Sequence, residues 1–360
     1  MTALGGIVVA LGLFAVLISS VLSSAPTSTG IITRPVHTTT TPRHHVTRST
    51  TTKTVTRRNS TNGRPGATPA GTYGVGTVTL NFVDQTRTVT FRTGLTEPRP
   101  LTTIVRYPTV KSASGTPGAA ARGPFPLIIF GHGFNEMPGI YHRLLRYWAS
   151  AGFIVAAPIF PLENRNAPGG PLETDLVNQP QDMSFVITSL LQLNAESGNQ
   201  LTGLINPKEI AVSGQSDGGD TALATAYDPT LRDPRVKAAM ILSGAEIPWL
   251  PTFTIAPGGP PLLATQGTRD DVNLPKDTGE FFDSAPAPKF LLKLLGAHHL
   301  GPYTNDPTQL PVVEQVTTAF LHYYLERDRA AMQTMLNVGN TPGIGRLLAY
   351  TTALGANSAK

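Results

Sequence analysis

Short apolar runs alternate with segments of helical spacing along most of the chain. Six runs have the length and continuous hydrophobicity of strands buried on both faces of a sheet, at residues 125–130, 153–160, 210–213, 236–242, 261–266 and 289–295. Four segments are compatible with helices, at residues 140–151, 175–193, 221–227 and 312–327. Strands that alternate with helices predict an α/β fold with a mostly parallel, doubly wound sheet.

The segment before this pattern has a different period. Apolar and polar residues alternate over residues 75–91 around Asp84-Gln85, which predicts an antiparallel hairpin that turns there. Residues 101–107 predict a third strand, and the Gly, Ala and Ser residues of 111–123 predict a loop. We therefore expect a mixed sheet with an antiparallel N-terminal hairpin. No long helical insertion interrupts the later pattern, so we expect no large lid.

The first part of the chain does not carry a globular pattern. Residues 4–22 are apolar apart from two serines, long enough to cross a bilayer. The next segment is rich in Thr, Ser, Pro and Arg and cannot bury enough apolar surface to offset its ordering entropy. This predicts four parts: a membrane anchor or signal peptide at 1–25, a disordered linker at 26–72, a catalytic domain at 73–330, and a C-terminal helical extension and tail at 331–360.

Two interpretations of residues 4–22 stay open. Ser23-Ser24-Ala25 has the small side chains of a signal-peptide cleavage site, but Pro26 follows directly and no Lys or Arg precedes the apolar segment. We expect a membrane-anchored or secreted protein whose catalytic domain lies outside the cytoplasm, with the Thr/Ser/Pro linker as a spacer. The positive charges follow the apolar segment, which by the positive-inside rule favours the opposite orientation.

The basic charge belongs to the linker. The chain has 28 basic and 23 acidic residues, and seven of the basic ones lie between residues 31 and 71. Subtracting 7 from 28 leaves 21 basic against 23 acidic residues, a net charge of −2 for the remainder. A basic face for nucleic acid is therefore not expected. The chain has no cysteine, which excludes disulfides, thiolate metal sites and a Cys nucleophile. We expect a monomer.

Residues 210–219 contain the motif Gly-x-Ser-x-Gly, centred on Ser216. A predicted strand precedes it and a helix-compatible segment follows, which is the context of a nucleophile elbow. The turn is so tight that its neighbours must be small, and Gly214 and Gly218 meet that need. A serine hydroxyl is a weak nucleophile near neutral pH and needs a base that a carboxylate orients.

Candidates for the acid and the base follow the later strands. Asp270 and Asp271 follow the strand at 261–266; we favour Asp270, three residues after the first Gly of that loop, and Asp271 stays an alternative. His298 and His299 follow the last predicted strand, and a Gly-Ala-x-His pattern selects His299. The order Ser, Asp, His, with each residue at a strand end, predicts a catalytic triad of Ser216, Asp270 and His299.

A tetrahedral intermediate also needs two converging N–H donors for its oxyanion. The backbone N–H of Asp217, directly after the nucleophile, is one candidate. The loop after the first buried strand reads Gly-His-Gly-Phe, and we expect the second donor at Phe134, with Gly133 as the alternative beside the substrate. We expect a structural role for His132. No HExxH or paired-carboxylate motif occurs, so we expect no metal and no cofactor.

Several motifs together carry a resemblance to a known superfamily. They are residues 105–108, 126–134, 152–158, 179–182, the elbow, 267–270 and 296–299. They are similar to those of α/β-hydrolases of the dienelactone hydrolase-like, platelet-activating-factor acetylhydrolase-like and polyester hydrolase (cutinase-like) group. The similarity extends over residues 73–330 and implies the α/β-hydrolase fold for that part.

The resemblance to polyester hydrolases also implies a cleft residue. Those enzymes place a Trp in the acyl cleft from a Pro-Trp pair after the sixth strand, and Pro248-Trp249 stands at the matching place here. The loop at 246–259 is longer and Pro-rich in this chain, and Asp217 stands where those enzymes usually carry Met. The oxyanion rim is therefore expected to be more polar. The cysteines of those enzymes are absent.

These features predict a serine hydrolase that cleaves small-molecule or polymeric carboxylic esters through an acyl-enzyme intermediate. One alternative keeps the fold and changes the bond to an amide or a thioester. Another is a non-catalytic surface protein on a hydrolase fold, which a missing triad residue would indicate, but none is missing. A haloalkane substrate is disfavoured because a dehalogenase needs Asp at the position of Ser216.

Overall fold

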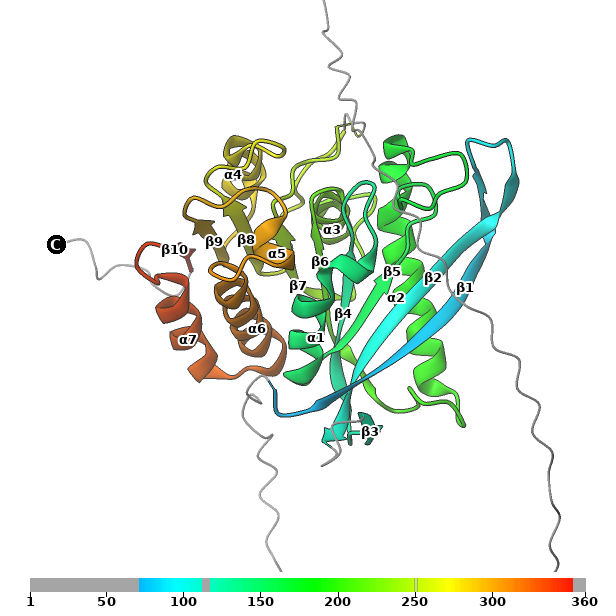
Figure 1. The fold of residues 1–360 in the computed structure, drawn as a ribbon, viewed down its shortest axis with the longest axis horizontal. Coiled ribbons are helices and arrows are strands. Elements are labelled where there is room, and N and C mark those ends of the chain that lie inside the picture. The colour runs from blue at the N-terminus through cyan, green and yellow to red at the C-terminus, as the bar shows by residue number, and fades with distance from the viewer. Residues whose placement is uncertain (1–70, 112–116, 249, 251, 352–360) are drawn as a thin grey trace, which may run out of the picture. The chain divides into compact units, whose positions relative to one another are not determined.

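A computed structural model of the chain describes residues 71–111, 117–248, 250 and 252–351 (Figure 1). The predicted membrane segment at 4–22, nearly all of the predicted linker and the predicted cleft residue Trp249 lie outside the described residues. Within the described residues, no helix has both the length and the hydrophobicity needed to span a bilayer.

The centre of the described part is a ten-stranded sheet. Its spatial order is β1 (Gly74–Thr90), β2 (Thr96–Lys111), β5 (Ile154–Pro158), β4 (Phe125–Gly131), β6 (Ile205–Gln215), β7 (Val236–Leu242), β8 (Leu262–Gly267), β9 (Lys289–Leu294) and β10 (Gly345–Tyr350), with β3 (Pro117–Ala120) paired to β2. Neighbours from β5 to β9 run parallel, and the pairs at both ends of the sheet run antiparallel. The predicted mostly parallel α/β sheet is thus confirmed.

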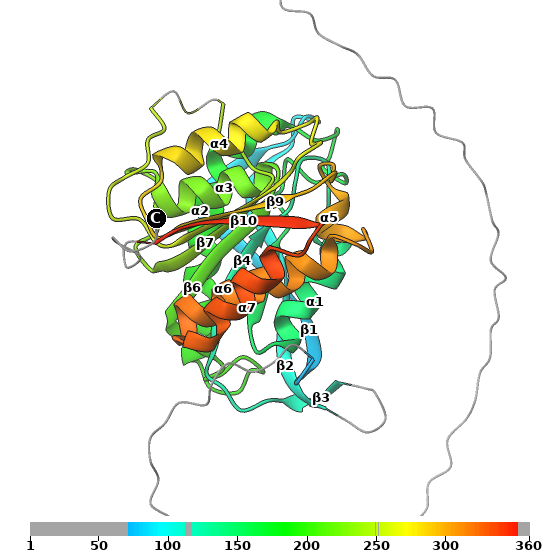
Figure 2. The same ribbon diagram turned by 90° about the vertical axis from the view of Figure 1, so that its left-hand side faces the viewer.

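Helices cover both faces of this sheet, as Figure 2 shows. One layer contains α1 (His142–Ser150), α5 (Gly301–Thr304), α6 (Leu310–Glu326) and α7 (Arg329–Gly339). The other contains α2 (Gln179–Ala195), α3 (Asp217–Tyr227) and α4 (Pro275–Ser284). Short 3₁₀ helices precede two of them, η1 (Pro138–Tyr141) before α1 and η2 (Glu173–Asn178) before α2.

The two helical layers explain why β4 is apolar and buried along its whole length. In β4, Leu127 and Ile129 pack into the core on the α2 and α3 face, whereas Ile128 and Phe130 pack into the core on the α1 and α6 face. All four are completely buried. Each such side chain contributes about 1.5–3 kcal/mol by leaving water, so the strands specify the two-sided layering.

The antiparallel hairpin turns at a different place from the one predicted. β1 continues through Asp84-Gln85, where its register with β2 shifts, and the turn comes at Phe91–Leu95. The Asp84 carboxylate accepts hydrogen bonds from the backbone N–H of Thr86 at 2.9 Å and from Arg87 Nε at 2.7 Å. An Asp that bonds to the backbone two residues on can form a turn. Here the same contact holds a bulge within a continuous strand.

The strand at 289–295, the last one predicted along the chain, is followed by a further strand. β10 follows α7 and pairs antiparallel with β9, with Gly345 opposite Leu294 and Tyr350 opposite Lys289. Only Gly345 and Leu347 of β10 are buried, so the strand lacks the apolar run that marks the central strands. Met335 of α7 and Leu347 pack into the same core as α6.

A buried ion cluster ties the hairpin to the helical layer beside it. Arg99 in β2 is only 1% exposed. Its guanidinium donates to both oxygens of Asp182 in α2, at 2.7 and 2.6 Å, and to both oxygens of Asp175 in η2, at 3.0 and 2.6 Å. Arg87, which is more exposed, donates to Asp182 at 2.7 Å. Four hydrogen bonds from one planar group fix the positions of η2 and α2 against β2.

We expect Arg99→Met to lower the free energy of unfolding by about 3–5 kcal/mol, because it leaves two buried carboxylates without their main partner. Arg87→Met is the matched control: it removes a partner of the same Asp182 from a more solvated position and should cost about 1 kcal/mol or less. Urea unfolding followed by circular dichroism measures both. Equal losses for the two variants would contradict a dominant role for Arg99.

Candidate active site

Ser216 lies on a tight turn between the end of β6 and the start of α3. Its backbone has φ 56° and ψ −128°, a conformation that residues other than Gly rarely adopt. A Cβ added to Gly214 would lie 1.9 Å from the Gly218 carbonyl oxygen, and one added to Gly218 would lie 2.2 Å from the Gly131 carbonyl oxygen. The close crossing of the chain therefore requires glycine at both positions.

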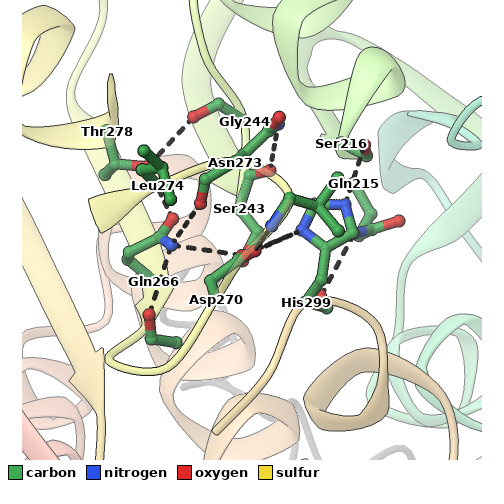
Figure 3. A network of polar contacts seen from close by, with 12 residues as sticks. Gln215, Ser216, Ser243, Gly244, Gln266, Asp270, Asn273, Leu274, Thr278 and His299 are labelled. Carbon is green, nitrogen blue, oxygen red and sulfur yellow. Dashed lines mark hydrogen bonds and ion pairs between the residues drawn. The ribbon is translucent and has the colours of Figure 1, made fainter. Parts of the chain in front are cut away.

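The structure brings Ser216, His299 and Asp270 together at the carboxyl ends of three parallel strands (Figure 3). His299 Nε2 lies 2.9 Å from Ser216 Oγ. On the other side of the ring, His299 Nδ1 lies 2.8 Å from Asp270 Oδ2 and 3.0 Å from Oδ1. An Nδ1–H that donates to the carboxylate leaves Nε2 free to accept the serine proton. These three groups have the spacing required for nucleophilic catalysis.

Asp270 is kept ionised by what surrounds it. Burial alone would raise its pKa, but contacts with His299 and the backbone N–H of Val272 outweigh that cost, so the pKa of Asp270 is lowered. The Val272 N–H donates to Oδ1 at 3.0 Å, and Gln266 Nε2 donates to Oδ2 at 3.1 Å. Gln266 is itself held by the Thr278 hydroxyl at 2.7 Å, as Figure 3 shows. The carboxylate is thus a fixed acceptor for the imidazole.

A chain of hydrogen bonds supports the histidine from the other side. The Gly133 N–H donates to the Tyr141 hydroxyl at 3.2 Å, and that hydroxyl donates to Gln215 Oε1 at 2.8 Å. The Gln215 amide then reaches His299 Nε2 at 3.1 Å and its carbonyl oxygen at 3.3 Å. An amide that donates to Nε2 favours the tautomer with its proton on Nδ1.

Gln215 and Tyr141 were not among the predicted site residues. Gln215 is the last residue of β6 and directly precedes Ser216, so an amide side chain inside the elbow motif was the available signal. Nothing local could have found Tyr141, because its hydroxyl reaches Gln215 only through the packing of α1 against the sheet.

Two backbone N–H groups near Ser216 form no hydrogen bond with another residue in the described part of the chain. Asp217 is the first residue of α3, where N–H groups lack acceptors within the helix. The Phe134 N–H, in the loop after β4, is also unbonded among the described residues, whereas Gly133 uses its N–H on Tyr141. A Cβ on Gly133 would lie 3.2 Å from Ser216 Cβ, so this loop runs directly beside the nucleophile. Asp217 and Phe134 are therefore the better candidates for oxyanion donors, and Gly133 borders the site.

His132 holds that loop in place. It is fully buried, and burial lowers its pKa to about 4, so it stays neutral over the physiological range. Nδ1 lies 2.9 Å from the Gly133 carbonyl oxygen, and Nε2 accepts from the Phe160 N–H at 3.1 Å. These contacts connect the loops that follow β4 and β5.

The rejected alternatives lie away from this network. Asp271 and His298 are both exposed, and neither forms a hydrogen bond with Ser216 or His299. In the described ranges, no cluster of three or more His, Cys, Asp or Glu side chains is arranged to hold a metal ion.

The side chain of Asp217, which was predicted to make the oxyanion rim more polar, lies in a strongly acidic environment. It is 7% exposed, and burial followed by the negative charge of Glu173 raises its pKa to about 7, although His299 opposes the shift. Two further carboxyls nearby, Glu163 and Asp220, have pKa values raised well above normal, first by burial and then by the charge of Asp217. Ser216 is thus followed along the chain by a residue of a mutually repelling group of carboxyls.

Comparison with known families gives one match. A family model described as Chlorophyllase matches residues 106–241, from within β2 to within β7. That family belongs to the α/β-hydrolase superfamily and broadly implies hydrolase activity on esters. No curated protein matches the chain in sequence. The matched range contains Phe134 and Ser216 but ends before Asp270 and His299, so only the geometry connects those two residues with the elbow.

We expect Asp270→Asn to lower kcat by about 10³–10⁴-fold, because an amide cannot hold His299 in the tautomer that accepts the serine proton. Asp271→Asn is the control: it makes the same chemical change one residue away, at an exposed position, and should change kcat less than about twofold. Steady-state hydrolysis of a soluble ester measures both. A larger loss for Asp271→Asn would assign the acid to that residue instead.

Proposed function

We propose that this chain, an α/β-hydrolase by its sheet topology and by its family match, is a serine hydrolase that cleaves carboxylic esters through an acyl-enzyme on Ser216. The observation that carries the proposal is the continuous series of contacts from Ser216 Oγ through His299 to Asp270, at 2.9 and 2.8 Å. The family match favours an ester as the bond, since it broadly implies hydrolysis of esters.

In the first half-reaction, Ser216 Oγ attacks the ester carbonyl carbon while its proton moves to His299 Nε2. The imidazolium that results is stabilised by the ionised Asp270, which stays deprotonated. The Asp217 and Phe134 N–H groups would donate to the oxyanion of the tetrahedral intermediate, where preorganised donors are most effective. Collapse of the intermediate breaks the bond to the alkoxy oxygen, which takes the proton from His299 and leaves as the alcohol.

The second half-reaction repeats these steps with water. His299 Nε2 removes a proton from a water molecule, whose oxygen attacks the acyl carbon on Ser216. The second tetrahedral intermediate uses the same two N–H donors. Its collapse returns the proton from His299 to Ser216 Oγ and releases the carboxylic acid, so the enzyme is regenerated without a cofactor.

A fluorophosphonate probe tests the nucleophile, and a series of p-nitrophenyl esters of increasing acyl length tests the substrate class. We expect one equivalent of probe to attach to Ser216 in the full chain, and hydrolysis of at least the short esters. The matched p-nitroanilide and thioester of the best acyl group distinguish the bond. If the anilide or the thioester is hydrolysed faster than the ester, after correction for the reactivity of the leaving group, the natural bond is an amide or a thioester instead of an ester.

We expect Ser216→Ala to lower kcat on a p-nitrophenyl ester by about 10⁴-fold or more, because residues of a triad act as a unit. The variant should keep the circular dichroism spectrum and unfolding midpoint of the parent chain to within a few degrees, since Ala removes only the hydroxyl. Activity within about tenfold of the parent would rule out Ser216 as the nucleophile.

A further inference from the structure

A cavity of about 310 Å³ lies against the first turn of α3, directly after the nucleophile. Acidic side chains dominate its wall: Glu173, Asp217, Asp220, Glu246, Asp277 and Glu280. They come from η2, from α3, from the loop after β7 and from α4. No Lys, Arg, His or aromatic side chain of the described residues lines it. The pocket is therefore anionic and lacks a counterion from its own wall.

The carboxyls of this pocket repel one another. Burial, and then the negative charge of Glu173, raises the pKa of Asp217. Burial and the charge of Asp217 raise the pKa of Asp220, and burial and Glu280 raise that of Glu246. The nearest basic contact is an exposed one, between Lys276 Nζ and Asp277 at 3.7 Å. A bound cation would reverse this repulsion and favour the ionised carboxylates.

Asp217 supplies a second, independent indication of a ligand. Its carboxyl is more than nine-tenths buried, and Oδ2 has no hydrogen-bond partner among the described residues. By contrast, Asp220 Oδ1 accepts from the Ala245 N–H at 2.5 Å. Leaving a buried polar oxygen unbonded costs about 1–3 kcal/mol. A hydrogen-bond donor in the cavity would supply the missing partner of Asp217 Oδ2. The backbone of Asp217 adjoins the nucleophile.

The size and chemistry of the cavity define the kind of donor. Its volume is several times the ~30 Å³ that one water molecule occupies in the liquid, so it has room for a bulky group. The carboxyls are spread around the wall, and no three are arranged to hold a metal ion. A protonated amine, with several N–H donors, matches an array of separate carboxylate acceptors.

We propose that this acidic pocket binds a protonated amine carried by the substrate, so that the enzyme prefers esters with an alkylammonium group. The proposal rests on the proposed ester hydrolysis at Ser216 and names its substrate class. Asp217 connects the two sites, because its backbone N–H faces the oxyanion position while its side chain lines the pocket. An ammonium bound there would hold the ester against the nucleophile.

The first experiment compares esters that differ only by replacement of a terminal methyl with an ammonium. One pair, ethyl 6-aminohexanoate and ethyl heptanoate, places the charge on the acyl side; the other, 4-aminobutyl hexanoate and pentyl hexanoate, places it on the alcohol side. We expect kcat/KM to favour the ammonium ester by about tenfold or more in at least one pair. The preference should shrink in 1 M NaCl, which screens charge. A ratio near one in both pairs would overturn the proposal.

Variants of α4 connect the preference with the pocket. Glu280→Gln combined with Asp277→Asn removes two carboxylates from the wall and should bring the kcat/KM ratio of the favoured pair close to one. Asp283→Asn is the control, because Asp283 is an exposed carboxylate on the same helix and does not line the pocket. An unchanged ratio in the double variant, or an equal drop in the control, would contradict the pocket assignment.

Calorimetric titration of the full-length Ser216→Ala chain tests the pocket independently of catalysis. We expect hexylammonium to bind and 1-hexanol not to bind, and we expect the Glu280→Gln, Asp277→Asn substitutions to abolish the hexylammonium signal. Binding of Ca²⁺ in place of hexylammonium, or of neither, would overturn the proposal. If no ester of either pair is hydrolysed by the parent chain while hexylammonium still binds, the proposed ester hydrolysis fails and the amine site stands.

Discussion

The close contact between the backbones of Gly131, Gly214 and Gly218 is the constraint on which the site depends. Because the first turn of α3 rests on β4 and β6 without side chains between them, the chain reverses sharply at Ser216, which has a positive φ of 56°. Asp217 follows as the first residue of α3, and the loop after β4 lies beside Ser216. The positions of Ser216 and of the two candidate oxyanion donors therefore depend on the same close packing of backbones.

The elbow separates two different electrostatic environments. On one side, His299 is held between the ionised Asp270 and the amide of Gln215. On the other side lie the carboxyls of the acidic pocket, of which Asp217 and Asp220 are buried, and no Lys, Arg or His of the described residues lines the wall beside them. Asp217 belongs to both, since its pKa responds to Glu173 from one side and to His299 from the other. The charge that enters the acidic pocket would thus influence the groups next to the reacting serine.

The features that the sequence could predict are those with a local cause. Strands buried on both faces are continuous apolar runs, and the elbow motif needs its glycines at fixed spacing, so the parallel sheet and the location of Ser216 could be inferred from the residues alone. The turn placed at Asp84-Gln85 was wrong because an Asp hydrogen-bonded to the following backbone can form either a turn or a bulge, and the pairing with β2 decides which. β10 escaped notice because only two of its residues are buried.

The rest depends on contacts between distant segments. Tyr141 meets Gln215 across 74 positions, and the acidic pocket collects carboxyls from four parts of the chain that share no spacing. In the sequence, nothing distinguishes any one of those carboxyls from an ordinary surface residue. Only the packing of η2, α3 and α4 around one cavity makes them a group.

The short helix η2 takes part in two different contacts. Asp175 fastens it to Arg99 of the hairpin, and Glu173, two residues earlier, forms part of the acidic wall beside the nucleophile. The hairpin at the edge of the sheet is therefore connected through η2 to the wall of the acidic pocket. Substitutions in the hairpin that shift η2 would also displace Glu173, so the proposed preference for ammonium esters depends on packing at the edge of the sheet, away from Ser216.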